Sequence, residues 1–239
     1  MLKLLLKLMT SVAYTAGISF FVYSGEGERG AASRLSAQTS YNSHTQTPFE
    51  GGIEKNIGGV FLNIWHDISK ERIQTDDFCA VIEIPKGCKT KYELDKGTGT
   101  LYMDRILYTS AHYPANYGFI PRTIAEDRDP LDVLVLCTED IQSLSLVRCR
   151  PIGVIAMLDS GFVDEKIIAV PFHDPTYNAY HDITELPKHV LEEMSHFFSV
   201  YKQLEGKATA VEHIQDAQEA KKIIRVCIER YEKEYGAKE

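Results

Sequence analysis

The stretch "AEDRDPLDVLVLC", residues 125–137, crowds four carboxylates immediately before an apolar run. The run, residues 133–136, is typical of a strand buried in a hydrophobic core. At an effective dielectric constant of about 20, two carboxylates about 5 Å apart repel each other by roughly 3 kcal/mol. Such crowding predicts a source of positive charge beside the strand. The four carboxylates are those of Glu126, Asp127, Asp129 and Asp132.

The composition of the whole chain is that of an ordinary globular protein. Of its 239 residues, 44% are hydrophobic and 25% are charged, which are usual proportions. The 34 acidic and 26 basic side chains give a net charge of −8, which argues against a nucleic-acid binder because such proteins present a basic face. An acidic protein can still bind an anionic substrate when divalent cations bridge the two. The five cysteines lack CxxC spacing, so we expect buried thiols in a reducing compartment, with neither a disulfide framework nor a zinc site.

The first 59 residues differ in composition from the rest. Residues 1–23 carry two lysines, no acid and an apolar run that is short for a membrane span. They are typical of a signal or targeting segment, and no stable membrane span is expected in the mature chain. Residues 24–59 are rich in small and polar residues without periodicity, which predicts a disordered leader. The alternative, an amphipathic helix of the fold, lacks a consistent apolar stripe, so the compact domain is expected at 60–239.

Several short strands are predicted in the first half of this domain. The segments are 78–85, two alternating strands within 90–107 around the turn "DKGTG", 132–138, 146–159 and 165–171. Gly97 and Gly99 in that turn can adopt positive φ, which a hairpin requires. The stretch "YPANYGFIP", residues 113–121, is predicted to be a turn because of its prolines and Gly118. Many short strands separated by turns predict a closed barrel.

The remainder of the chain is predicted to be helical. From His189 to Leu204 the apolar residues follow a helical stripe, which Pro187 opens. A second helix is expected from Asp216 toward residue 236, with Glu219 as the capping-box partner. The residues alone therefore predict an α+β fold in which C-terminal helices pack outside a β-barrel.

A second acidic group lies in "LDSGFVDEKIIAV", residues 158–170. Asp159 ends one predicted strand, Asp164 precedes the next, and Lys166 starts it. Hard cations such as Mg²⁺ prefer oxygen ligands and keep several waters, so a few carboxylates at adjoining strand ends suffice to bind them. Two solvated acidic turns remain the alternative interpretation. An EF-hand loop is excluded because Pro130 and Leu131 occupy positions where that loop needs a ligand and a glycine.

Cations and phenols are scattered along the same domain. They include Lys91, Arg105, Tyr113, Tyr117, Lys166, Tyr201 and Lys202. Each also has an ordinary explanation; Lys202, for example, lies near the C-terminal end of a predicted helix, where a cation is favoured. Divalent metals beside Arg, Lys and Tyr donors are nevertheless what a phosphoryl-transfer site requires.

The motif "EDRDPLDVLV" resembles the Asp-x-Asp-Pro-x-Asp signature of the soluble family I inorganic pyrophosphatases. The resemblance continues in the same order from about Trp65 to Tyr231. Its further motifs are "VIEIPKG", "KYELDK", "DRILY", "YPANYGFIPRT", "RPIGVIAMLDSG", "DEKIIAVP" and "HFFSVYKQLEGK". So many collinear motifs leave little room for chance agreement. The residues of the motifs "KYELDK", "DRILY" and "WHDI" are most similar to those of plant-type eukaryotic members.

The resemblance implies a five-stranded OB-like β-barrel that hydrolyses pyrophosphate to two orthophosphates with several Mg²⁺ ions. By position in the family motifs, the metal nearest the nucleophilic water would bind Asp127, Asp132 and Asp164. Asp132 would also bridge to a second metal, and Asp129 would accept the proton of the water. Metals arriving with the substrate would bind Asp159, Glu83 and Glu93. The phosphates would be held by Lys91, Arg105, Tyr117, Lys166, Tyr201 and Lys202. A homo-oligomer is also expected.

Two features depart from the family pattern. Arg128 occupies a position that is usually small or uncharged, and the spacing from Glu83 to Lys91 is one residue shorter than in many bacterial members. Neither departure removes a catalytic side chain, so an active enzyme is expected. Because successive side chains of an extended segment point to opposite faces, we expect Arg128 to face away from the metals, toward solvent or a surface acid such as Glu126.

Two other functions fit part of the sequence. A metal-dependent phosphohydrolase acting on nucleotides would need a base pocket, and no Gly-rich phosphate loop accompanies the motifs. A catalytically silent binding protein would have lost an aspartate, and all of them are present.

The leader also bears on the compartment. The stretch "SRLSAQTSYNSHTQT", residues 33–47, contains one arginine, many hydroxyls and no acid. After a signal-like segment, this composition is typical of import into an organelle lumen through the secretory route, such as a complex plastid. A mitochondrion and the cytoplasm are the alternatives.

Overall fold

The computed structural model describes residues 63–159 and 162–236. The signal-like segment 1–23 and the leader 24–59 lie outside the described residues, as do the first positions of the domain expected at 60–239. In the part of the chain that is described, no helix is both long and apolar enough to cross a membrane. The five cysteines are free thiols, and Cys79, Cys149 and Cys227 are buried.

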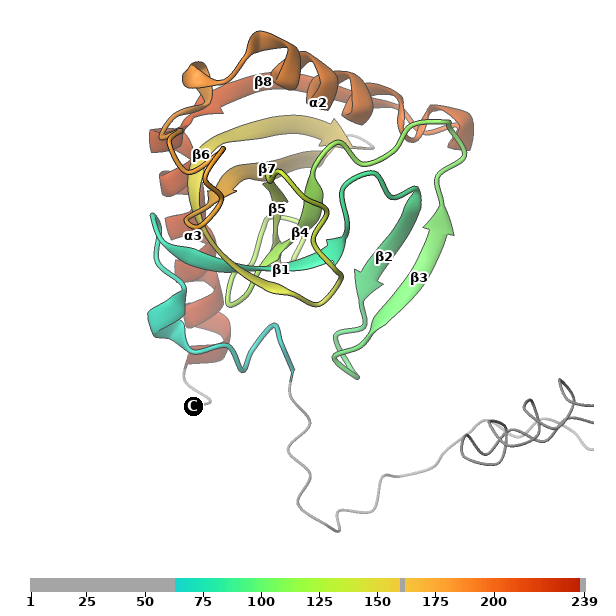
Figure 1. Cartoon of the computed structure of the whole chain (residues 1–239). Helices are drawn as coiled ribbons and strands as arrows, with labels where there is room; N and C mark the ends of the chain where they lie inside the picture. The colour runs from blue at the N-terminus through green and yellow to red at the C-terminus, as the bar shows by residue number, and fades with distance from the viewer. Residues whose placement is uncertain (1–62, 160–161, 237–239) are drawn as a thin grey trace, which may run out of the picture. The chain divides into compact units, whose positions relative to one another are not determined.

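Strands make up most of the regular structure of the described residues, and the two α-helices lie in the C-terminal part (Figure 1). The strands are β1 (Phe78–Ile84), β2 (Thr90–Leu94), β3 (Leu101–Ile106), β4 (Asn116–Ile120), β5 (Leu131–Val135), β6 (Leu146–Asp159), β7 (Phe162–Pro171) and β8 (Thr209–Asp216). The helices are α2 (Lys188–Val200) and α3 (Ala217–Tyr235), and the 3₁₀ turns are η1 (Lys70–Arg72), η2 (Ile183–Glu185) and η3 (Gln203–Glu205). This confirms the predicted combination of a strand-rich body with C-terminal helices.

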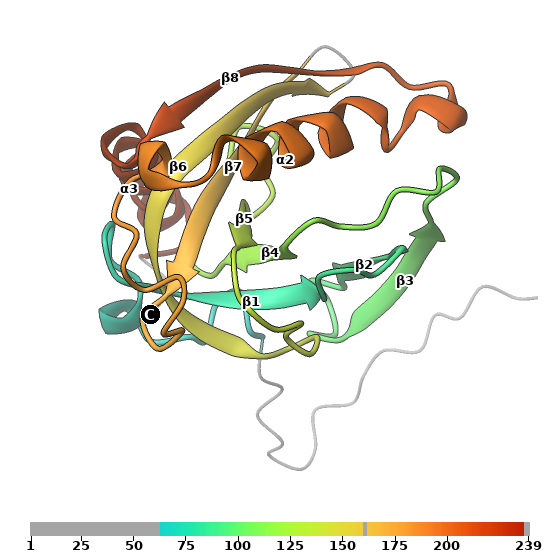
Figure 2. The same cartoon turned by 45° about the horizontal axis from the view of Figure 1, so that its top comes forward.

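The main sheet has the strand order β1-β4-β5-β7-β6-β8, and β1 also pairs with β6. Five of its strands therefore pair in a closed ring, to which β8 adds along the edge of β6. Neighbours are antiparallel except for β5 and β7, which run parallel. Strands β2 and β3 form a separate antiparallel hairpin beside the ring (Figure 2).

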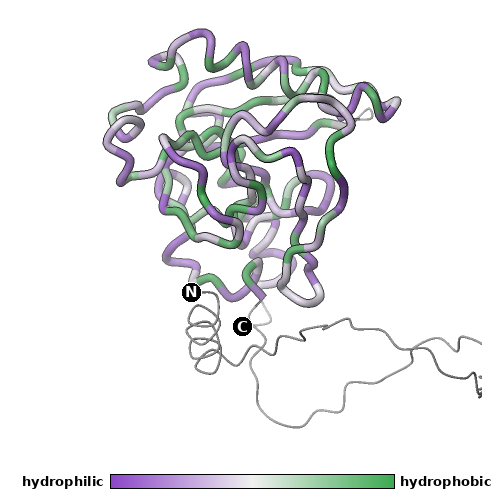
Figure 3. Tube along the Cα trace, turned by 45° about the vertical axis from the view of Figure 1, so that its right-hand side comes forward, coloured by the Kyte–Doolittle hydropathy of each residue, from purple (hydrophilic) through white to green (hydrophobic). Residues whose placement is uncertain are grey.

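The strands of the ring are hydrophobic on both faces, and each face packs against a different helix. Leu134 of β5 and Ile168 of β7 belong to a cluster that includes Phe198 of α2. The adjacent residues of the same strands, such as Val133, lie in a second cluster with Ile224 of α3. This period of two is what a strand buried on both faces requires. Figure 3 shows hydrophobic stretches of the trace within the body of the domain and hydrophilic stretches along much of its outer trace.

The predicted helices are confirmed, with small changes at their ends. The apolar stripe of α2 is buried through Met194, Phe197 and Phe198. Helix α3 begins where the capping signal placed it, since the Asp216 side chain accepts a hydrogen bond of 2.9 Å from the backbone N–H of Glu219. This bond satisfies one of the donors that the first turn of a helix leaves without a partner.

The prediction of a turn at residues 113–121 is wrong, because five of these residues form the buried strand β4. Gly118 is needed there for close approach of two backbones: a Cβ at this position would lie 1.8 Å from the carbonyl oxygen of Val81. The Asn116 side chain accepts hydrogen bonds from the backbone N–H groups of Lys86 and Ile141. Residues that favour turns locally are therefore used here for tertiary packing.

The prediction that the C-terminal part is wholly helical is also wrong. Strand β8 lies between the two helices and pairs with β6 from Gly153 to Asp159. Its side chains are half-buried or exposed, so it lacks the apolar pattern of a core strand. Pairing with the long strand β6 stabilises β8 instead, and no local pattern in the sequence of β8 indicates this pairing.

Candidate active site

A cavity of about 540 Å³ gathers most of the residues predicted for the site. Twelve of the thirteen line it: Glu83, Lys91, Glu93, Tyr117, Asp127, Asp129, Asp132, Asp159, Asp164, Lys166, Tyr201 and Lys202. The exception is Arg105, which does not line the cavity. Its Nε donates a hydrogen bond of 3.0 Å to Glu205, and its guanidinium also contacts Asp104.

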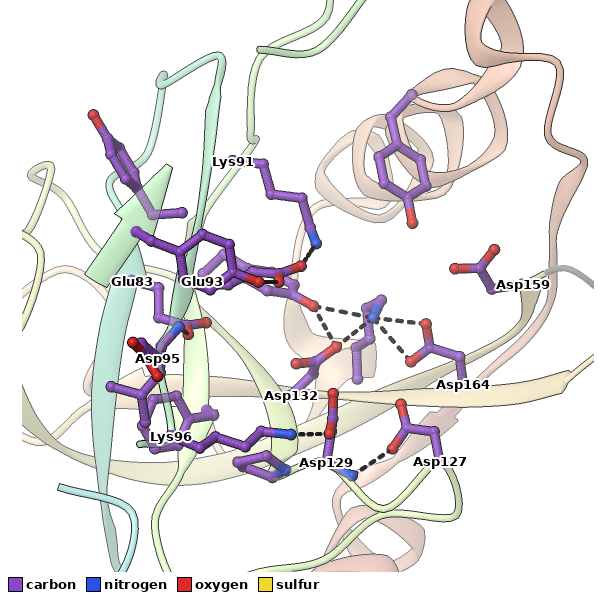
Figure 4. A pocket seen from close by; sticks show the side chains of 18 of the residues that line it. Glu83, Lys91, Glu93, Asp95, Lys96, Asp127, Asp129, Asp132, Asp159 and Asp164 are labelled. Carbon is purple, nitrogen blue, oxygen red and sulfur yellow. Dashed lines mark hydrogen bonds and ion pairs between the residues drawn. The ribbon is translucent and has the colours of Figure 1, made fainter. Parts of the chain in front are cut away.

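The strand order explains why residues so distant in sequence meet in one cavity. The parallel pairing of β5 and β7 sets Asp132 directly beside Lys166. The antiparallel pairing of β6 with β7 brings Asp159 and Asp164 to the same end of these strands. Strands β1 and β2 supply one wall, and the residues after α2 supply Tyr201 and Lys202. Figure 4 shows the acidic side chains converging from these separate elements.

Lys166 is the buried cation at the centre of the acidic group. Its Nζ donates to Asp132 at 2.6 Å, to Asp164 at 2.9 Å and to the Tyr117 hydroxyl at 3.1 Å, while its side chain is only 3% exposed. Burial lowers the pKa of Lys166, but Asp132 and Asp164 outweigh burial and hold that pKa well above its usual value. Lys166 therefore carries a charge throughout the physiological pH range.

Tyr117 and Asp132 share the environment of Lys166. Burial, and then the charge of Asp132, raise the pKa of Tyr117 well above its usual value, so the phenol keeps its proton and donates a hydrogen bond to the Asp132 carboxylate. Burial also raises the pKa of Asp132, against the opposing effect of Lys166. This carboxylate is therefore costly to ionise without a nearby cation.

Glu83 is the most deeply placed acid of the cavity. It is 8% exposed, and its Oε1 accepts a hydrogen bond of 2.7 Å from the backbone N–H of Leu94. Burial, followed by the charge of Asp132, raises the pKa of Glu83 to about 8. Glu83 is thus mostly protonated at neutral pH, and an added cation would have to displace its proton before binding both oxygens.

Three further lysines pair with acids around the cavity. Lys202 contacts Asp159, and Lys91 contacts Glu93. Lys96 contacts Asp129, and sequence reasoning missed this lysine because it lies in the turn of the β2–β3 hairpin, where charged residues are ordinarily solvated. Its neighbour Asp95 also lines the cavity and was missed for the same reason.

The acidic loop before β5 folds back on itself. The backbone N–H of Asp129 donates 3.0 Å to an oxygen of Asp127, and the Asp129 carbonyl accepts 2.8 Å from the N–H of Ala125. Between the two aspartates, Arg128 adopts a φ of 75°, a conformation that few residues other than glycine and asparagine adopt readily.

Arg128 faces away from the cavity, as predicted, although residues 126–129 form a turn rather than the extended segment on which that prediction relied. Its side chain is 70% exposed and contacts Glu234 of α3 at 2.6 Å. The expected partner, Glu126, instead contacts Arg230 at 3.3 Å. Glu126 and Arg128 thus link the acidic loop to the last turns of α3, and neither side chain enters the cavity.

The donors of the cavity suit hard divalent cations. Eight acidic and four lysine side chains line it, and oxygen ligands of this kind are those that Mg²⁺ prefers. Among the described residues, no three histidine, cysteine or acidic side chains lie close enough together to hold one ion. The lysine ammonium groups lie against several of the carboxylates instead, so the donor type fits a divalent cation while the side chains would have to turn to enclose it.

A polar cavity lined by acidic side chains and by lysines, one of them the buried Lys166, is typical of an enzyme that acts on phosphate groups. A family model described as "Inorganic pyrophosphatase" matches residues 80–232. "Soluble inorganic pyrophosphatase 2" of Chlamydomonas reinhardtii is 47% identical over 177 residues, which are 74% of this chain and 92% of that protein. "Soluble inorganic pyrophosphatase 1" of Arabidopsis thaliana is 42% identical over 82% of this chain and 95% of its own length.

Solved structures agree with these relatives. The inorganic pyrophosphatase of Helicobacter pylori superposes with a TM-score of 0.65 at 44% identity, over 67% of this chain and 96% of that one. The inorganic pyrophosphatase of Thermus thermophilus gives a TM-score of 0.69 at 37% identity, over 72% and 99%. The chain therefore belongs to the inorganic pyrophosphatase family. Its reaction is the hydrolysis of inorganic pyrophosphate to two orthophosphates.

Proposed function

We propose that the enzyme carries out this hydrolysis with several Mg²⁺ ions at the cavity. The observation that supports this most strongly is the excess of acids over lysines among the residues that line it. Pyrophosphate is itself an anion, so its approach to such a surface requires added positive charge. The metal ligands in this proposal are Asp127, Asp132, Asp159, Asp164, Glu83 and Glu93.

Asp129 is the proposed general base. Its side chain is 58% exposed and lines the cavity next to the ligand candidates Asp127 and Asp132. Divalent cations held by these carboxylates would offset their repulsion and lower the pKa of a water molecule. Asp129 would accept the proton of the attacking water and orient that water toward phosphorus.

The cations and phenols of the cavity are proposed to hold the two phosphate groups. Lys166 remains charged while buried, so it offers a fixed positive group to a phosphate in the cavity. The other members are Lys91, Tyr117, Tyr201, Lys202 and Arg105. Of these, Arg105 would have to release Glu205 to reach the substrate.

Phosphate release from pyrophosphate, measured with and without Mg²⁺ and compared with release from ATP, tests this proposal. Release from pyrophosphate should require Mg²⁺ and should exceed release from ATP by at least about 10²-fold, as expected when a site is built around one substrate. Equal rates with ATP would favour a nucleotide phosphohydrolase instead. Full activity after exhaustive chelation would refute the metal dependence.

Arg128 provides a negative control within the acidic loop. The exchange Arg128→Asn should leave kcat and the Mg²⁺ concentration at half-maximal activity within about threefold, a change below about 0.7 kcal/mol. The Arg128–Glu234 pair is exposed and contributes little, and asparagine tolerates the positive φ. Titrating Mg²⁺ against activity for both proteins checks this. Tenfold tighter binding in the variant would mean that Arg128 acts on the metals.

We also propose that the ring of β1, β4, β5, β7 and β6 is an OB-like barrel and that the enzyme is a homo-oligomer. Ring closure through the β1–β6 pairing supports the first point. Exposed apolar side chains on and beside β3, such as Met103 and Tyr108, support the second. Sedimentation of the full chain tests the oligomeric state, and a monomer at micromolar concentration would contradict it.

The leader is proposed to direct the enzyme to an organelle lumen, plastid-like in its route, with the domain at 60–239 as the mature enzyme. The support is the signal-like composition of 1–23 and the hydroxyl-rich, acid-free stretch within 24–59. Residues 1–60 fused to a fluorescent reporter should reach the organelle. A mitochondrial signal would indicate the alternative destination, and a diffuse cytosolic signal would refute targeting.

A further inference from the structure

The hairpin between β2 and β3 places Lys96 at the wall of the cavity. Its ammonium group contacts one oxygen of Asp129, and its Nζ lies 5.4 Å from the centre of the Trp65 ring. Of the described side chains, Lys96 alone bonds to the Asp129 carboxylate. In Figure 4 the second oxygen of Asp129 is directed away from Lys96.

The backbone around Lys96 is held firmly by the preceding residue. The Asp95 carboxylate accepts hydrogen bonds of 2.9 Å from the N–H of Gly97 and from the Thr98 hydroxyl. The Asp95 N–H donates 2.8 Å to the carbonyl of Thr100. Such a side-chain-capped turn fixes where the Lys96 side chain begins.

The segment before η1 supports the same turn from the other side. The Asn63 side-chain amide donates 3.0 Å to the carbonyl of Lys96. The Trp65 indole N–H donates 3.0 Å to the carbonyl of Thr123, and the Trp65 carbonyl accepts 3.0 Å from the N–H of Arg122. One buried indole is thus fixed to the segment that leads into the acidic loop, and Lys96 lies over its ring.

Lys96 differs from an ordinary lysine in a turn because it contacts both an aromatic ring and a carboxylate. A cation over an aromatic face is attracted by the ring, and the long lysine side chain can pack on it while its ammonium group reaches the carboxylate. Asp129 is more than half exposed, so without such a partner its carboxylate would rotate freely. A base that rotates spends less time in the orientation that accepts a proton.

We propose that Lys96 is a positioning residue for Asp129. It holds one carboxylate oxygen, so that the other is presented to the water that attacks pyrophosphate. Trp65 and Asn63 act through Lys96 by fixing its side chain and its backbone. The inference rests on the proposed role of Asp129 as the base.

The kinetic test compares Lys96→Met and Lys96→Arg with the full-length enzyme. Lys96→Met keeps the length of the side chain but not its charge, and it should lower kcat by about tenfold, since misplacing a reacting group costs one to two orders of magnitude. The KM for pyrophosphate should stay within about twofold because Lys96 does not hold the substrate in this proposal. Lys96→Arg should recover most of kcat. Lys222→Met, an exchange at an exposed lysine of α3, serves as the charge-matched control and should change neither constant.

A second measurement follows the contact without turnover. Trp65 is the only tryptophan of the chain, so its emission reports on the ammonium group over its ring. Lys96→Met should change this emission, and Asp129→Asn should change it too because Lys96 then loses its ionic partner. Lys222→Met should leave the emission unaltered. Identical emission in Asp129→Asn and the unmodified enzyme would overturn the proposed contact.

The outcomes separate this inference from the proposed function. If Asp129→Asn loses activity but Lys96→Met keeps the kcat of the unmodified enzyme, the positioning role is wrong and the base assignment stands. If Asp129→Asn keeps full activity, the base assignment fails, and the positioning role fails with it. A loss in Lys96→Met that arginine does not recover would also overturn the role, since it would indicate general damage to the turn.

Discussion

Asp129→Asn is expected to lower kcat by at least about 10²-fold while preserving the fold and the affinity for Mg²⁺. General-base groups contribute about 10²- to 10⁴-fold to their reactions, and asparagine matches aspartate in shape but cannot accept the proton. The loop should remain intact, because the contacts that shape it use the backbone N–H and carbonyl of Asp129 rather than its side chain.

The measurement is steady-state phosphate release together with calorimetric titration of Mg²⁺. Asp76→Asn makes the same chemical change at an exposed position away from the cavity and should behave as the unmodified enzyme. Turnover within a few-fold of normal in Asp129→Asn would remove this residue from the mechanism. Loss of Mg²⁺ binding in the variant would reassign Asp129 as a ligand.

Lys166→Met is expected to reduce both activity and stability more than any other lysine exchange in the cavity. It leaves Asp132 and Asp164 side by side without their buried cation. Removing one partner of a buried ion pair costs about 3–5 kcal/mol of the free energy of unfolding. Loss of a fixed cation at the developing phosphate charge should lower kcat by about 10²- to 10³-fold.

The loss of stability in Lys166→Met should depend on pH. Burial already raises the pKa of Asp132 in the folded protein, and removing Lys166 can only raise it further. A folded-state pKa above the unfolded value means that protonation favours the folded state. The variant should therefore be closest to the unmodified enzyme at acidic pH, and the deficit should grow as the pH rises through the raised pKa.

Thermal unfolding from pH 5 to pH 8, with and without Mg²⁺, measures this effect. Mg²⁺ should recover part of the stability at pH 8, because a cation that binds the folded state stabilises it by mass action. Lys202→Met removes a lysine that contacts Asp159 at a more exposed position and should show a smaller deficit. An unchanged unfolding midpoint in Lys166→Met would contradict the description of Lys166 as the charge that balances this cluster.

The sequence was most informative for elements whose own residues stabilise them. Strand β1 reads as a buried strand from its apolar run, and α3 begins at the residue that its capping signal indicates. Strand β4 was missed because Gly118 allows close approach to the backbone of β1, nearly forty positions earlier. Rules that use only neighbouring residues cannot detect such a contact. Strand β8 was missed because its stability comes from β6 rather than from its own side chains.

The residues of the candidate site likewise divide into those that a local pattern indicates and those that depend on residues distant in sequence. Asp127, Asp129 and Asp132 were found because like charges crowded before a buried strand are costly and need an explanation. Glu83 and Glu93 were assigned only through the family resemblance. Lys96 was missed, since nothing in the turn itself indicates that Trp65 and Asp129 lie on either side of this lysine. Arg105 was expected among the phosphate-binding groups, whereas Glu205, a hundred residues later, draws it out of the cavity.

The parallel alignment of β5 and β7 also determines when the contact between Lys166 and Asp132 can form in a newly made chain. Residues 136–161, which include β6, must be synthesised before Lys166 can meet Asp132, and Lys202 emerges later still. Contacts so distant in sequence carry a loop-closure cost and form slowly. A ribosome-bound chain therefore exposes the aspartates of the acidic loop well before their buried counter-charge exists. Lys166 can balance the charge of Asp132 only after β7 has been made and has paired with β5.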